Sequence, residues 1–180
     1  MPSWAIVVII AVIVAAAVAA WSIMSRRRTQ HLRTQFGPEY DRLLKEQGGQ
    51  RNAEEELLRR EKRVQKLAIH PLEPQQRDRF AQSWHADQAR FVDDPKGAVV
   101  EADRLVSEVM KARGYPVGDF EQRIGDISVD HGRVVENYRA ACAIAQRQKR
   151  GETNTEDLRK AMIHYRELFD DLLELHEVRR

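Results

Sequence analysis

The feature that most constrains this chain is an uncharged apolar run from Trp4 to Met24, which reads WAIVVIIAVIVAAAVAAWSIM. As a helix, a run of this length would measure about 30 Å, which matches the hydrocarbon thickness of a bilayer. Trp4 and Trp21 stand near its two ends, where indole rings favour the membrane–water interface. The run therefore predicts a single transmembrane helix, with residues 1–25 as the membrane anchor.

A cleaved signal peptide and a buried core helix are the alternatives for this run. A secretory signal has a positively charged start, a short apolar stretch and a small-residue cleavage site. Residues 1–3 carry no charged side chain and the run is long, but its alanines at 15–17 and 19–20 resemble a cleavage site. Cleavage would leave a secreted helical domain. We prefer a retained anchor, because 18 or more uncharged apolar residues are typical of a membrane span.

Three arginines, Arg26, Arg27 and Arg28, follow the run directly. The positive-inside rule keeps such a flank in the cytoplasm, so we expect a cell (inner) membrane protein with its C-terminal domain in the cytoplasm. Residues 26–66 hold 12 Lys and Arg against 7 Asp and Glu. Each basic residue near an anionic leaflet contributes roughly 1 kcal/mol of attraction, which makes the lipid bilayer the first expected partner.

The remaining residues are enough for one ordinary core but not for several domains. Residues 67–180 contain 18 Lys and Arg against 21 Asp and Glu, and this mildly acidic balance argues against nucleic acid as a ligand. Cys142 is the only cysteine, so an intrachain disulfide is impossible. A single cysteine suits a reducing compartment.

Residues 26–69 predict a basic helical linker or stalk next to the membrane. Leu57, Val64 and Leu67 form a thin apolar stripe among dense charges, a pattern typical of a short coiled coil. Such a stripe would pair two copies of the chain in a homo-oligomer. The alternative is a solvated helix that packs loosely on the rest of the chain.

Residues 70–180 predict a helical bundle. Apolar residues recur at steps of three and four, and the faces at 99–110 and 158–172 are expected to meet in one core. No stretch beyond the apolar run alternates with period two, so the fold class is all-α: a transmembrane helix, a stalk and an antiparallel helical bundle. The expected N-caps are Asp94, Asp119, Asp130, and Thr153 or Thr155 for the last helix.

Three segments, FVDDPKGAVVEADRLVSEVMKARGYP, FEQRIGDISVDH and VVENYRAA, resemble a family of uncharacterised bacterial proteins with one N-terminal hydrophobic segment. The resemblance covers roughly residues 36–175. It implies a bacterial origin and a membrane or envelope setting. The family has no assigned activity, so the resemblance implies no site residues.

A search for chemistry finds no Gly-rich phosphate loop, no zinc-ligand spacing and no paired cysteines, so no catalytic, cofactor or metal residues are assigned. Cys142 and Trp84 lie on apolar faces and are interpreted as core. Asp126, Asp130 and His131 gather where a helix is expected to break between Gly125 and Gly132. Breaks on a rigid scaffold often carry binding residues, so these three are the candidate partner-binding residues.

The sequence thus predicts a single-pass, membrane-anchored helical interaction protein, an adaptor or assembly factor for an unknown protein partner, and not an enzyme. The rival hypothesis is an enzyme or small-molecule sensor with a site inside the bundle. A polar pocket with converging ionisable residues would favour that rival.

Overall fold

The computed structural model describes the backbone of residues 3–174 and the side chains of residue 4 and of residues 12–174. This part of the chain is entirely helical, without a strand, which confirms the all-α prediction. Its elements in chain order are α1 (Ser3–Phe36), α2 (Pro38–Glu46), α3 (Gln50–Val64), α4 (Pro74–Arg90), α5 (Pro95–Ala112), α6 (Phe120–Asp130), α7 (Val135–Lys149) and α8 (Thr155–Leu172).

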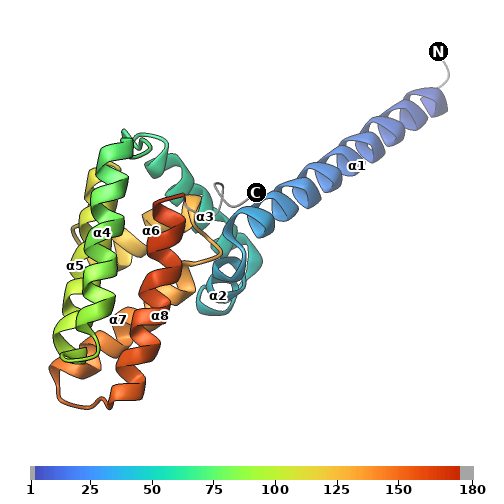
Figure 1. Ribbon diagram of the computed structural model, residues 1–180. Coiled ribbons are helices and arrows are strands. Elements are labelled where there is room, and N and C mark those ends of the chain that lie inside the picture. The colour runs from blue at the N-terminus through green and yellow to red at the C-terminus, as the bar shows by residue number, and fades with distance from the viewer. Residues whose placement is uncertain (1–2, 175–180) are drawn as a thin grey trace.

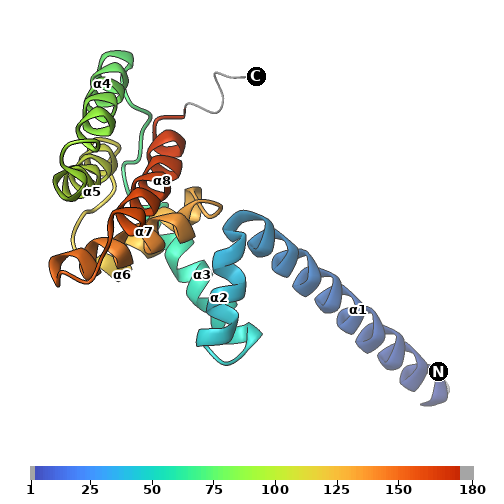
Figure 2. The same ribbon diagram turned by 60° about the horizontal axis from the view of Figure 1, so that its bottom comes forward.

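Helix α1 leaves the body as a single long rod, with no other helix beside its N-terminal half in either view (Figures 1 and 2). Trp21 is 74% exposed and Met24 is also exposed, whereas Leu32 and Phe36 near the C-terminal end are fully buried in the body. Within the described residues, no helix has the length and hydropathy of a membrane span. The predicted span overlaps residues 5–11, whose side chains lie outside the described part.

The bundle is built from two helical hairpins, α4–α5 and α7–α8, in which α8 packs against both α5 and α7 (Figure 1). The faces at 99–110 and 158–172 meet in one core, as the periodicity predicts. Trp84 of α4 stacks on Phe169 of α8, with ring centroids 4.6 Å apart. The bundle and its aromatic core are therefore held mainly by apolar burial.

Side-chain caps fix where most of the bundle helices begin. Asp94 accepts a hydrogen bond from the Gly97 amide at 2.9 Å, and Asp119 accepts one from the Gln122 amide at 3.0 Å, as predicted. The prediction for the last helix is wrong, because its cap is Asn154 and not Thr153 or Thr155. Asn154 accepts from the Asp157 amide at 2.9 Å, and the Asp157 carboxylate accepts the Asn154 amide in return, which satisfies two free donors at once.

A second core lies between the C-terminal end of α1, α2 and α3, and Val129 of α6 closes it. Leu57 and Val64, the stripe expected to make a stalk, are buried there against α1 and α2. This region is therefore a compact N-terminal unit and not an extended stalk. Helix α6 joins the two cores, because Ile124 and Ile127 pack in the bundle core while Val129 packs in the second.

Asp87 of α4 is 4% exposed, and neither of its carboxylate oxygens has a hydrogen-bond partner within the described residues. Burial and the neighbouring charge of Glu101 raise the pKa of Asp87 from 3.8 to about 6. The folded state therefore binds the proton more tightly than the unfolded state, and stability falls as the pH rises from about 4 to about 6. A shift of this size corresponds to about 3 kcal/mol at neutral pH.

We therefore expect Asp87→Asn to raise the melting temperature of the full chain at pH 7.5, and to change it little at pH 4.5. Asp93→Asn, at an exposed carboxylate in the α4–α5 turn, is the control and should change neither value. Thermal unfolding followed by circular dichroism measures both variants. A lower melting temperature for Asp87→Asn at pH 7.5 would contradict this interpretation.

Candidate functional site

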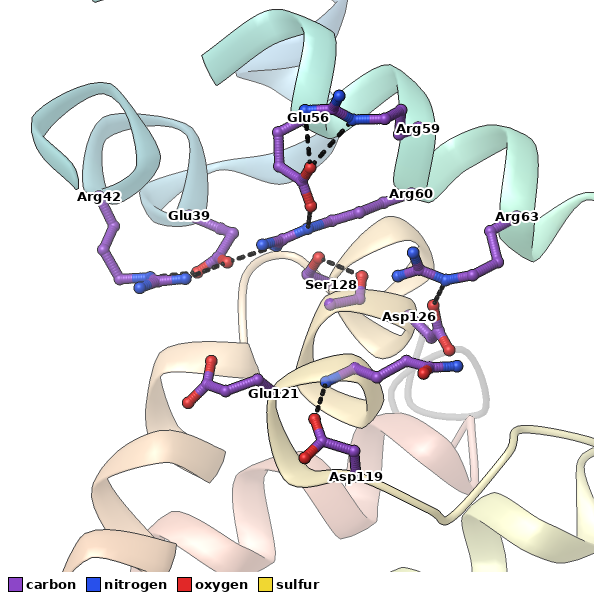
Figure 3. A network of polar contacts seen from close by, with 12 residues as sticks. Glu39, Arg42, Glu56, Arg59, Arg60, Arg63, Asp119, Glu121, Asp126 and Ser128 are labelled. Atoms are coloured by element: carbon purple, nitrogen blue, oxygen red, sulfur yellow. Dashed lines mark hydrogen bonds and ion pairs between the residues drawn. The ribbon is translucent and has the colours of Figure 1, made fainter. Parts of the chain in front are cut away.

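The N-terminal unit is joined to the bundle by a buried ionic network (Figure 3). Its centre is Glu39 of α2, whose side chain is 0% exposed. The Glu39 carboxylate accepts hydrogen bonds from Arg42 at 2.7 and 2.8 Å, from Arg60 of α3 at 2.7 Å and from Arg139 of α7 at 3.1 Å. Burial alone would raise the pKa of Glu39, but the hydrogen bonds from Arg42 and Arg60 and the charge of Arg139 hold it at about 2.

Asp126 forms a separate, partly buried ion pair beside this network and does not lie on an open surface. Its side chain is 1% exposed, and its Oδ1 accepts a hydrogen bond from Arg63 Nε of α3 at 2.6 Å (Figure 3). Helix α6 runs through Gly125 and ends at Asp130, so the helix does break between Gly125 and Gly132, but only near Gly132. A Cβ on Gly125 would lie 3.3 Å from Arg60, which indicates that this glycine lets α3 approach α6 closely.

The break itself comprises residues 131–134, between α6 and α7. Asp130 was expected to cap α7, but the residue at that position is Val134, which makes no side-chain cap hydrogen bond. The Asp130 carboxylate instead accepts a hydrogen bond from the Tyr115 hydroxyl at 2.6 Å. Burial raises the pKa of Tyr115 well above its ordinary value, so the hydroxyl remains the donor. Asp130 thus ties the end of α6 to the α5–α6 connection.

A cavity of about 730 Å³, here called the junction cavity, lies where this break meets the ends of four helices. Its lining comes from the C-terminal ends of α1, α3, α5 and α8 and from the end of α6 with the break that follows it. It includes Gln35, Glu61, Arg113, Asp130, His131, Arg133, Asp171 and Glu174. The junction cavity therefore touches both the N-terminal unit and the bundle.

Two sets of side-chain contacts to the C-terminal end of α8 line the bundle side of the junction cavity. His131 Nδ1 lies 2.5 Å from Asp171 Oδ2 of α8, and the His131 ring is mostly buried. Arg113 donates to the Leu172 carbonyl at 2.8 Å and to the Glu174 carboxylate at 2.9 Å. His131 Nε2, the other ring nitrogen, is buried and has no hydrogen-bond partner within the described residues. The contact of Nδ1 with Asp171 therefore fixes the orientation of the ring and of this second nitrogen.

The rim of the junction cavity carries mixed charge. Four carboxylates, those of Glu61, Asp130, Asp171 and Glu174, face two arginines and one histidine. Arg133 is exposed and makes no ion pair within the described part of the chain, so its charge is available to a ligand. Among the described residues, no group of three His, Cys, Asp or Glu side chains is arranged to hold a metal ion.

The break is also packed directly on the end of α1. A Cβ on Gly132 would lie only 2.6 Å from the Gln35 carbonyl oxygen and 2.8 Å from the Phe36 Cα. A side chain at position 132 would therefore push the break away from α1. This close approach couples the long helix to the wall of the junction cavity.

The structure brings Asp130 and His131 to one cavity but places Asp126 on the α3 side of α6, away from it. The functional candidates that sequence reasoning missed are Arg113, Arg133 and Asp171. Arg113 and Asp171 stand at the ends of helices far apart in the chain, and only the tertiary fold brings them together. Arg133 could have been selected from the sequence, because it is a charged residue that directly follows Gly132, the end of the predicted break.

Cys142 is buried, and its Sγ lies 3.9 Å from Asp103 and 3.7 Å from the Tyr165 hydroxyl. Burial and the nearby Asp103 charge raise the pKa of the Cys142 thiol to about 12. The reactive form of a cysteine is the thiolate, so this position suits a core residue and not a nucleophile.

The predicted membrane-facing residues have described side chains at Trp4, Trp21 and the three arginines. Both tryptophans are exposed. Arg28 Nε lies 3.6 Å from Glu54 of α3, while Arg26 and Arg27 make no ion pair within the described residues. The arginines thus stand between the exposed part of α1 and the N-terminal unit.

No protein-family model, no curated protein and no solved structure matches this chain, so its resemblance to a bacterial membrane-protein family stays a prediction.

Proposed function

We propose that this chain is a single-pass membrane protein of the bacterial cell membrane that holds a helical partner-binding domain at the cytoplasmic surface. The observation that carries the proposal is the continuity of α1. The helix that begins in the uncharged run ends at Phe36 inside the second core, without a break. The lipid bilayer is the first partner, and a protein is the second.

A continuous helix would fix the distance and the orientation of the body. Leu32, the first fully buried residue of α1 after the apolar run, lies eight positions beyond Met24. At about 1.5 Å per residue, the body would begin about 12 Å from the end of the apolar run. A flexible linker would leave the body free to rotate, whereas this arrangement would present one chosen face to the leaflet.

The junction cavity is the proposed partner site. It is polar, its rim includes Arg133, which makes no ion pair within the described residues, and its wall packs closely on the end of α1 at Gly132. A charged segment of a partner protein matches this rim of mixed charge. The pairing of two copies expected through Leu57, Val64 and Leu67 is not kept, because Leu57 and Val64 are buried within one chain. The exposed apolar face of α1, which has no partner within the described residues, is the surface proposed for pairing instead.

The topology can be tested with thiols introduced on the two sides of the proposed membrane. Ser3→Cys should react with an impermeant thiol reagent in intact bacteria, while Glu152→Cys, in the exposed α7–α8 turn, should react only after permeabilisation. The buried Cys142 should stay unlabelled in both cases. Labelling of Glu152→Cys in intact cells would exclude a cytoplasmic domain, and loss of the N-terminal residues from the mature mass would establish a cleaved signal.

Partner binding is tested by crosslinking capture from native membranes with charge variants of the full chain. Arg133→Glu should reduce capture several-fold, because it reverses the charge of an exposed rim arginine that makes no ion pair within the described residues. Lys160→Glu, an equal charge reversal at an exposed position of α8, should leave capture unchanged. Both variants should keep the wild-type melting temperature, since exposed substitutions seldom change stability by more than about 0.5 kcal/mol. Equal capture by both variants would place the partner surface elsewhere.

A small-molecule sensor is the second candidate function. The volume of the junction cavity falls in the range of about 300–1,000 Å³ that is typical of small-molecule sites, and ionisable groups converge on it. A rise in melting temperature with one small polar molecule, lost in Arg133→Glu and kept in Lys160→Glu, would favour this candidate over a protein partner.

A further inference from the structure

A second, smaller cavity of about 250 Å³ lies between α1 and the start of α3, just beyond the apolar run. Its lining residues are Ser25, Arg26, Thr29 and Gln30 of α1 and Gln50 of α3. Here it is called the α1–α3 cavity. It is separate from the junction cavity, which touches the last turn of α1 and the other end of α3.

The α2–α3 turn is fixed beside this part of α1 by side-chain hydrogen bonds. Gln50 Nε2 donates to Thr29 Oγ1 at 2.9 Å and to Glu54 Oε1 at 2.8 Å, and Thr29 donates to the same Glu54 oxygen at 2.7 Å. The turn therefore returns toward the beginning of the polar part of α1. Arg51, the next residue along, has a side chain that is 90% exposed.

The position of the α1–α3 cavity along α1 corresponds to the headgroup layer of a bilayer. The polar layer on each side of the hydrocarbon is about 5–8 Å thick. Ser25 to Gln30 cover about 8 Å along the helix axis, starting directly after Met24. If the apolar run spans the hydrocarbon, these residues and the α2–α3 turn lie among the lipid headgroups.

The chemistry of the α1–α3 cavity suits an anion. Arg26 makes no ion pair within the described residues, and Ser25 and Gln30 add neutral hydrogen-bond donors. The one carboxylate close by, Glu54, is buried and accepts hydrogen bonds from Thr29, Gln50 and Tyr40. Burial would raise the pKa of Glu54, but these hydrogen bonds lower it, so its charge is already compensated within the protein.

We propose that the α1–α3 cavity binds the phosphate of an anionic phospholipid headgroup, with Arg26 as the charged ligand and Ser25 and Gln30 as hydrogen-bond donors. The proposal rests on the membrane anchor proposed above. It adds a specific lipid contact that would keep the α2–α3 turn on the leaflet and hold the body in one orientation.

The test uses the full chain in vesicles, with a fluorophore attached at Gly49→Cys. Gly49 has an extended backbone (φ 169°) and open space where a Cβ would stand, so a cysteine is tolerated there. Gly118→Cys, in the α5–α6 connection and with equally open space, is the matched control. The buried Cys142 thiol, with its raised pKa, stays unreactive. The vesicles contain phosphatidylcholine with a trace of headgroup-nitroxide lipid, and phosphatidylglycerol is added in steps.

Quenching should be strong at Gly49→Cys and weak at Gly118→Cys, and quenching at Gly49→Cys should rise with phosphatidylglycerol. Arg26→Gln should increase the phosphatidylglycerol fraction needed for half of this rise about fivefold, as expected for one basic residue near an anionic surface. Lys66→Gln, an equal loss of charge beyond the other end of α3, should not.

Failure of the two proposals can be distinguished. A chain that does not float with vesicles lacks the membrane anchor, and the lipid site falls with it. A chain that floats, but whose label at Gly49→Cys is not quenched or is quenched equally without phosphatidylglycerol, keeps the anchor and overturns the lipid site. A response to inorganic phosphate in neutral vesicles that depends on Arg26 would also overturn the lipid assignment, in favour of a free anion.

Discussion

Leu105→Asp is expected to unfold the bundle. Leu105 lies in the middle of α5, is 2% exposed and packs in the core formed by α4, α5, α7 and α8. An aspartate there would place a carboxylate among apolar side chains with no group to pair it. Burying an unpaired charge costs several kcal/mol or forces the group to take up a proton, and a typical domain has only about 5–15 kcal/mol of stability.

Val100→Asp is the matched control for Leu105→Asp, because Val100 lies on the same helix and is 55% exposed. Its melting temperature should stay within a few degrees of the wild-type value. Circular dichroism at 222 nm on the full chain in detergent follows the loss of helix for each variant. Equal melting temperatures for the two variants would mean that the 99–110 face is not core.

The bundle could be predicted from the sequence because local signals and long-range packing agree there. The faces of α5 and α8 repeat every three or four residues, and Asp94 and Asp119 mark helix starts that the structure confirms. Each helix carries enough apolar surface to identify its own buried side. The sequence alone therefore indicates both that these helices form and which sides meet.

The second core could not be predicted in the same way. Leu57 and Val64 form a stripe that is too thin to define a core by itself. The apolar side chains that complete this core come from the end of α1, from α2 and from Val129 of α6. From the sequence alone, charged residues such as Glu39 and Arg60 are expected to face solvent. In the structure they are buried, because they form an ion pair with each other. A charge-rich helix can thus be an interior helix when its counter-charges come from distant elements.

The candidate site shows the same limit. His131 was singled out because it lies in a break, and the structure does place it in a cavity. Its partner Asp171 is 40 residues away along the chain, and no local pattern points to the pair. Asp126 was grouped with His131 because the two are close in sequence. The structure places Asp126 against Arg63 of α3, whereas His131 lines the junction cavity. Asp126 lies inside α6 and His131 lies just beyond its end, so proximity in sequence was a poor guide.

Glu39→Gln is expected to loosen the N-terminal unit from the bundle. The variant keeps the shape of the side chain and removes the charge shared by Arg42, Arg60 and Arg139. Removing one partner from a buried ion pair costs about 3–5 kcal/mol, because the remaining charge stays desolvated. Arg60 keeps a contact with Glu56 at 3.1 Å, so the lower end of that range is expected.

The pH dependence supports a cost of the same size. The pKa of Glu39 falls from 4.5 to about 2 on folding, so the unfolded state binds the proton more tightly. The contribution of Glu39 to stability is therefore complete above about pH 4.5 and disappears as the pH falls through about 2. The shift corresponds to about 3 kcal/mol. The difference between wild type and Glu39→Gln should shrink over the same pH range.

Glu46→Gln is the control for Glu39→Gln, because Glu46 pairs with the same Arg42 but has a side chain that is 50% exposed. An exposed pair of this kind contributes up to about 1 kcal/mol, so Glu46→Gln should change stability little. Hydrogen exchange on the full chain then locates the effect. In Glu39→Gln, amide protection should fall first in α2 and α3 and persist in α5 and α8, because those two helices pack in the bundle core without Glu39. A uniform loss of protection across all of these helices would instead mean that α6 binds the two cores into one cooperative unit, and that the ionic network stabilises the whole fold and not the attachment of the N-terminal unit.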